Sequence, residues 1–67
     1  MRQDIEKYFG ILDLRPNASF EEVRRAYKIL IKVWHPDRFQ NEPGLLKEAE
    51  SKVKDINHAY DELNRYF

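Results

Sequence analysis

Apolar residues recur along this chain at the three- and four-residue spacing of amphipathic helices. The first such pattern runs from Asp4 to Leu12. Its apolar members are Ile5, Tyr8, Phe9 and Leu12. The pattern ends before Arg15-Pro16-Asn17, because a proline disfavours helix in the residue that precedes it. We therefore predict a short helix followed by a turn.

A second helix is predicted to open at Ser19, because Glu22 follows three residues later in a capping-box pattern. A cap residue of this kind contributes about 0.5–2 kcal/mol. Pro36 should end the helix near Trp34. One side of this helix is apolar, with Val23, Ala26, Tyr27, Leu30, Val33 and Trp34. The opposite side is basic, with Arg24, Arg25, Lys28 and Lys32.

A third helix should begin near Glu42 or Pro43, because proline is tolerated in a first helical turn. Its apolar positions form a coiled-coil-like seam over about three heptads. They are Leu46, Ala49, Val53, Ile56, Tyr60, Leu63 and Phe67. We expect this seam to pack antiparallel against the second helix, with the first helix across the base. The predicted fold is all-α, a helical hairpin with a short N-terminal helix packed on it.

Composition limits the classes of protein that remain. Sixty-seven residues make one small domain, residues 1–67. The chain has no cysteine and two histidines, so we expect no disulfide, no metal and no cofactor. The N-terminus is charged, unlike a signal peptide, and no apolar run reaches the roughly 20 residues of a membrane span. We therefore expect a cytoplasmic monomer that does not bind membranes.

Charge is balanced overall but not along the chain. Twelve basic and twelve acidic side chains give a net charge of zero, yet residues 19–38 hold five basic against three acidic. This balance argues against a nucleic-acid partner, whereas a local basic region suits an acidic protein surface. Arg24, Lys28 and Lys32 follow at steps of four, and each like-charged pair costs about 0.2–0.5 kcal/mol. A helix selected for stability alone would avoid these like-charged pairs, so we interpret the basic side as a docking face rather than a merely solvated one.

His35-Pro36-Asp37 interrupts the helical pattern between the second and third helices. A rigid proline, an imidazole and a carboxylate held out by two helices indicate contact with another molecule. The plainer interpretation is a helix stop, because aspartate also tolerates turn geometry. Two ligands are too few for a metal, and no nucleophile or second base lies at a spacing that suggests catalysis. We expect the Asp37 carboxylate to be exposed and free to contact another molecule.

Four motifs, in this order, resemble the J-domain of the DnaJ co-chaperone family. They are Tyr8-Phe9-Gly10-Ile11-Leu12-Asp13-Leu14, residues 18–27, His35-Pro36-Asp37-Arg38 and residues 52–63. The resemblance implies a module, not an enzyme, that docks on a heat-shock protein 70 chaperone and stimulates its ATP hydrolysis. Such a module can stand alone or form part of a longer co-chaperone.

The family also implies roles for individual residues. Its loop aspartate engages an arginine near the chaperone's interdomain linker, and its basic helix lies on an acidic surface of the ATPase domain. Carried over by position, Asp37 is the acceptor, and His35 and Pro36 set the loop. The docking face would comprise Arg24, Arg25, Tyr27, Lys28 and Arg38.

The sequence departs from the family pattern at four positions. Asp13 stands where glycine is common, which predicts a different backbone geometry in the first turn. Ile29 replaces a residue that is often basic and narrows the charged patch. Val53 is smaller than the frequent phenylalanine, and Phe39 follows the loop motif without an assigned role.

Several aromatic and polar residues have a structural interpretation. Tyr8, Phe9, Trp34 and Tyr60 lie on apolar stripes and are expected in the core rather than in a binding cage. Tyr27, at the edge of its stripe, could serve both core and docking. Asn57 and His58 read as a surface pair without function.

Three other functions remain open. The chain could be a three-helix nucleic-acid binder, a hairpin that oligomerises through its seam, or a J-like domain that binds a chaperone without stimulating it. A salt-sensitive shift with duplex DNA would favour the first, and concentration-dependent dimers would favour the second.

Overall fold

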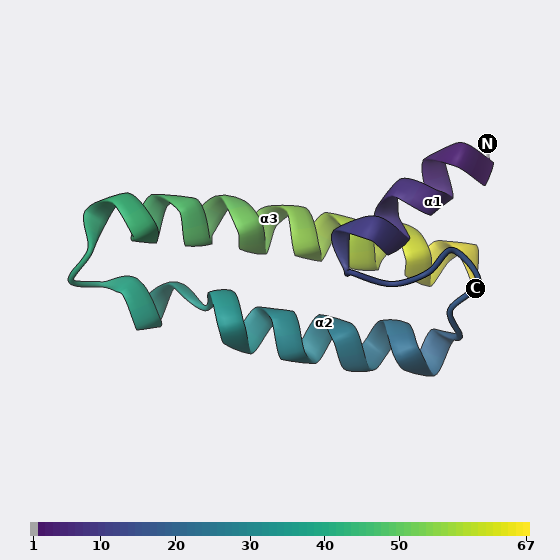
Figure 1. The fold of residues 1–67 in the computed structure, drawn as a ribbon, viewed down its shortest axis with the longest axis horizontal. Coiled ribbons are helices and arrows are strands. Elements are labelled where there is room, and N and C mark those ends of the chain that lie inside the picture. Colours follow the sequence, from purple (N-terminus) through teal and green to yellow (C-terminus); the bar gives the residue numbers. More distant parts are fainter. Residues whose placement is uncertain (1) are drawn as a thin grey trace.

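The computed structural model describes the backbone of residues 2–67 and the side chains from Ile5 onward. Within that part, the elements in chain order are α1 (Arg2–Ile11), α2 (Phe20–Trp34), the 3-10 helix η1 (Pro36–Phe39) and α3 (Pro43–Tyr66), and no strand is present. α2 and α3 lie side by side and antiparallel, and η1 lies next to the bend at the end opposite both termini (Figure 1). α1 packs mainly against α3. The predicted all-α hairpin is confirmed.

The first helix ends in a Schellman motif. The Leu14 N–H donates to the Phe9 carbonyl at 2.8 Å, and the Asp13 N–H donates to the Gly10 carbonyl at 3.0 Å. Asp13 has φ 60°, in the left-handed region that glycine adopts without steric cost. Aspartate is one of the few other residues that tolerate this conformation. The chain therefore turns from α1 towards α2 at Asp13.

The predicted capping box at the start of α2 is present. The Glu22 N–H donates to Ser19 Oγ at 3.1 Å, and the Ser19 N–H donates to Glu22 Oε1 at 2.9 Å. The pKa of the Glu22 carboxyl is lowered, mainly because its carboxylate accepts the backbone N–H of Ser19, with smaller contributions from the Ser19 side chain and from Arg25. α2 ends at Trp34, as the position of Pro36 in the sequence predicted. α3 begins at Pro43, also as predicted.

The core joins all three α-helices. Its buried members are Phe9, Leu12, Ala18, Val23, Ile56, Ala59 and Leu63. Tyr8, Trp34 and Tyr60 are half-buried and pack against this cluster, so the structure confirms their structural role. The part of the chain that the structure describes contains no helix long and apolar enough to cross a membrane.

Three details of the predicted apolar faces are wrong. Val33 is 43% exposed, and Ile31 packs against the core in its place. Ala59, absent from the predicted seam, is fully buried. α3 is contacted by both α1 and α2, so its buried face is wider than a seam for one partner. Phe67 lies beyond the end of α3 and is 53% exposed.

Candidate functional site

The loop that carries His35-Pro36-Asp37 is a turn of 3-10 helix rather than an irregular connection. His35 is both the last cap of α2 and the first cap of η1, with an extended ψ of 128°. Pro36 occupies the first position of η1, where its fixed φ suits the turn and its missing N–H costs nothing. The tripeptide therefore stops one helix and starts another at the bend of the hairpin.

The imidazole of His35 caps the N-terminus of η1. Its Nδ1 accepts the backbone N–H of Asp37 at 3.2 Å. A nitrogen that accepts a hydrogen bond carries no hydrogen, so this geometry belongs to the neutral ring with its hydrogen on Nε2. Asp37 Oδ2 lies 3.7 Å from the same Nδ1, which is too far for a hydrogen bond.

The Asp37 carboxylate points away from the core. Its side chain is 76% exposed, as expected from the sequence. Oδ1 accepts one hydrogen bond within the loop, from Gln40 Nε2 at 3.2 Å. A carboxylate has about four lone-pair positions, so it keeps room for the two parallel hydrogen bonds of a guanidinium. The carboxylate is therefore oriented by the loop and remains open to a partner.

Arg38 ties the loop back to the preceding helix. Its Nη1 donates to the backbone carbonyl of Lys32 at 3.2 Å. That carbonyl belongs to the last turn of α2, where cationic side chains satisfy unpaired acceptors and favour the negative end of the helix dipole. In this structure the side chain expected on the docking face closes the end of α2.

The basic face of α2, defined here as Arg24, Arg25, Lys28 and Lys32, is exposed along its length. Arg24, Arg25 and Lys28 line a shallow depression together with Glu21. None of the four cations forms an ion pair with another described residue, so the acidic side chains of α3 do not neutralise them. Ile29 is exposed beside them and adds an apolar position.

Tyr27 is held against α3 rather than standing free. Its ring stacks on Tyr60 with centroids 4.2 Å apart and an angle of 17° between the planes. Its hydroxyl donates to Asn57 Oδ1 at 2.7 Å. Tyr27 is thus half in the core and half on the surface that also carries the basic face.

Comparison with known proteins assigns the family. The model of one protein family, described as the DnaJ domain, matches residues 7–66. This chain belongs to the DnaJ domain family. The J-domain resemblance of the four sequence motifs is therefore confirmed, and with it the fold class.

The relatives that match this DnaJ domain are longer proteins named chaperone protein DnaJ. The chaperone protein DnaJ of Thermotoga neapolitana is 45% identical over 64 residues, which cover 96% of this chain and 16% of that protein. The chaperone protein DnaJ of Thermosipho africanus is 55% identical over 58 residues, which cover 85% of this chain and 14% of that protein. The chain thus spans about a sixth of the length of these curated relatives. No solved structure matches it.

Two polar residues of the site were missed from the sequence. Gln40 contacts the Asp37 carboxylate from three residues further along the chain, a spacing that a helical loop would have suggested. Asn57 binds the Tyr27 hydroxyl across the hairpin, and nothing in the local pattern indicates this contact. The register between α2 and α3 brings Asn57 to the Tyr27 hydroxyl.

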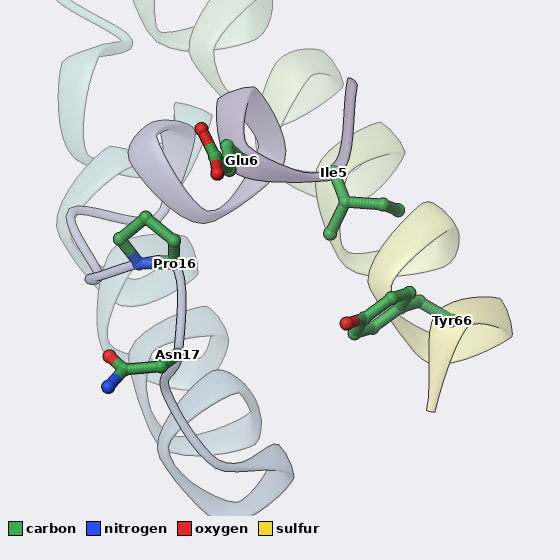
Figure 2. A pocket seen from close by; sticks show the side chains of 5 residues that line it. All are labelled: Ile5, Glu6, Pro16, Asn17 and Tyr66. Atoms are coloured by element: carbon green, nitrogen blue, oxygen red, sulfur yellow. The ribbon is translucent and has the colours of Figure 1, made fainter. Parts of the chain in front are cut away.

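A hollow of about 370 Å³ lies at the opposite end of the DnaJ domain from the loop. Ile5 and Tyr66 lie on one side of it, and Pro16 and Asn17 lie on the other (Figure 2). This hollow contains none of the residues expected to meet a chaperone. The residues that the sequence analysis assigned to docking lie instead in the loop and on α2.

Proposed function

We propose that this DnaJ domain docks on a heat-shock protein 70 chaperone and stimulates its ATP hydrolysis, without an active site of its own. The observation that carries the proposal is the Asp37 carboxylate, which is exposed near the bend of the hairpin and oriented by one hydrogen bond from Gln40, while His35 holds the backbone N–H of the same residue. The adjoining basic face, free of ion pairs to other described residues, supports it. The roles of His35, Pro36 and Asp37 are those that the family resemblance implies.

The two parts of the surface do different work in this proposal. Asp37 accepts a charged hydrogen bond from a chaperone arginine near the interdomain linker, an interaction worth about 1.5–3 kcal/mol. The basic face meets an acidic surface of the ATPase domain, which raises the association rate and limits the choice of partner. Stimulation follows if the domain binds the hydrolysis-competent conformation of the chaperone better than the resting one.

The structure bears on the oligomeric alternative. Ala49, Ile56 and Leu63 of the seam are buried within the single chain. A dimer through that seam would have to open the hairpin and expose its core. We therefore keep the prediction of a monomer, which sedimentation at several concentrations tests.

The deciding experiment is a single-turnover ATPase assay of this domain with a panel of heat-shock protein 70 chaperones. We expect the unaltered domain to accelerate hydrolysis by at least one of them, and Asp37→Asn to abolish the acceleration. Asp55→Asn is the matched control, because it removes another exposed carboxylate from α3, outside the loop. Circular dichroism should show equal helicity and melting for all three proteins.

Two results would count against the proposal. Acceleration at full strength by Asp37→Asn would reject the loop as the contact. A salt-sensitive gel shift with duplex DNA, without any chaperone stimulation, would favour nucleic-acid binding by the basic face instead.

A further inference from the structure

Tyr27 contacts two residues that lie on one face of α3. Asn57 and Tyr60 lie three residues apart on that helix, so they stand on the same side, one turn from each other. Tyr60 stacks on the ring at 4.2 Å, and Asn57 accepts the hydroxyl hydrogen at 2.7 Å. The ring plane and the hydroxyl direction of Tyr27 are therefore both set from α3.

The hydrogen bond to Asn57 limits what Tyr27 can offer to a partner. A phenol has one hydrogen, and here that hydrogen points to Asn57 Oδ1. The Tyr27 oxygen then presents lone pairs only. An acidic partner surface cannot receive a hydrogen bond from Tyr27 unless the contact with Asn57 breaks.

Asn57 supplies donors in its place. Its Oδ1 is occupied by Tyr27, which leaves the amide nitrogen with two hydrogens. Asn57 is exposed, and its amide nitrogen makes no hydrogen bond to another described residue. Arg24 and Lys28 flank Tyr27 along α2 and are also exposed. The surface around Tyr27 therefore presents cationic and amide donors from two helices.

We propose that Asn57 belongs to the docking surface as the residue that positions Tyr27 and turns its own amide hydrogens outward beside the basic face. This proposal rests on the proposed function, and it extends the docking surface from α2 onto α3. The occupant that the surface fits is the acidic protein surface already inferred for the basic face.

The first test uses the isolated domain and needs no chaperone. Tyr27→Phe, Asn57→Ala and the double variant form a double-mutant cycle, read by urea unfolding. We expect each single change to raise the unfolding equilibrium constant about three- to tenfold, the usual effect of one lost hydrogen bond. The double variant should lose no more than the worse single variant. Additive losses would overturn the positioning role.

The second test separates positioning from packing with Asn57→Asp. This variant keeps an oxygen acceptor for Tyr27, so its melting temperature should stay close to that of the unaltered domain. It replaces the outward amide with a negative charge beside Arg24 and Lys28. We expect the domain concentration for half-maximal ATPase stimulation to rise about tenfold at low salt, with the rate at saturation unchanged. Asn17→Asp makes the same charge change in the α1–α2 connection and should leave that concentration unchanged.

Equal half-maximal concentrations for Asn57→Asp and the unaltered domain would overturn the place of Asn57 in the docking surface. If the unaltered domain stimulates no chaperone, the proposed function fails and the docking role fails with it. The unfolding cycle still decides whether Asn57 positions Tyr27, so the two failures are distinguishable.

Discussion

Phe39 packs against Trp34, with ring centroids 6.1 Å apart and an angle of 30° between the planes. This contact joins the last residue of η1 to the last residue of α2. Lys52 of α3 lies over the same indole, with its Nζ 5.4 Å from the ring centroid. Three elements therefore meet at Trp34. Phe39, which had no assigned role in the sequence, anchors the loop that presents Asp37.

Phe39→Ala should loosen this anchor. The half-buried ring gives up its contact with Trp34, and we expect the free energy of unfolding to fall by about 1–2 kcal/mol. Trp34 is the single tryptophan, so its fluorescence reports the change directly. Phe39→Leu keeps apolar volume at the position and should lose less stability. An alanine variant with unchanged emission and unchanged denaturation midpoint would show that the contact does not hold the loop.

Lys28→Glu tests whether the basic face acts through long-range charge. Lys28 is exposed and forms no ion pair with another described residue, so the fold should tolerate the change. Chaperone association should slow strongly at low salt and much less at high salt, because at 0.1 M salt the interactions between exposed charges more than about 10 Å apart are largely screened. Stopped-flow binding at several ionic strengths measures this. Equal losses at all salt concentrations would point to a packing role for Lys28.

The capping box predicts a loss of stability in acid. The folded-state pKa of Glu22 is lowered, so its contribution is complete above the unfolded pKa and disappears as the pH falls through the folded pKa. Glu22→Gln lacks this titration, so the stability difference between it and the unaltered domain should shrink on acidification. Urea unfolding from neutral to strongly acid pH measures that difference. A difference that does not change with pH would contradict the assignment.

Ser19→Ala removes the other half of the capping box. It removes the oxygen that accepts the Glu22 N–H, and caps of this type contribute about 0.5–2 kcal/mol. Part of its loss of stability should persist in acid, where the contribution of the Glu22 carboxylate has disappeared, because the backbone N–H of Glu22 does not titrate.

The left-handed conformation of Asp13 predicts an order of stability among its variants. Asp13→Gly removes the steric cost of φ 60°, whereas Asp13→Ala keeps that cost without the polar side chain that tolerates it. We expect the glycine variant to be more stable than the alanine variant by about 1 kcal/mol, despite the larger entropy of glycine in the unfolded chain. Thermal unfolding compares them. An alanine variant at least as stable as the glycine variant would show that the turn has another conformation in solution.

The local elements of this domain could be predicted from the sequence because each depends on neighbours within one or two turns. The Ser19–Glu22 capping box, the end of α2 before Pro36 and the start of α3 at Pro43 are of this kind. The loop motif also lies in one continuous stretch, so its exposure at the bend followed from the helices on either side. Helical periodicity and turn chemistry suffice for these features.

Contacts between helices were decided only by the tertiary structure. Periodicity shows which residues share a stripe, but not how far each helix rotates about its axis when two partners compete for one face. α3 receives both α1 and α2, which widens its buried face to include Ala59, and on α2 it is Ile31 rather than Val33 that packs against the core. The same register brings Asn57 to the hydroxyl of Tyr27, thirty residues away in the chain. Local sequence therefore specifies the helices, their caps and the loop that interrupts them, whereas the packing of the helices specifies which side chains support the site.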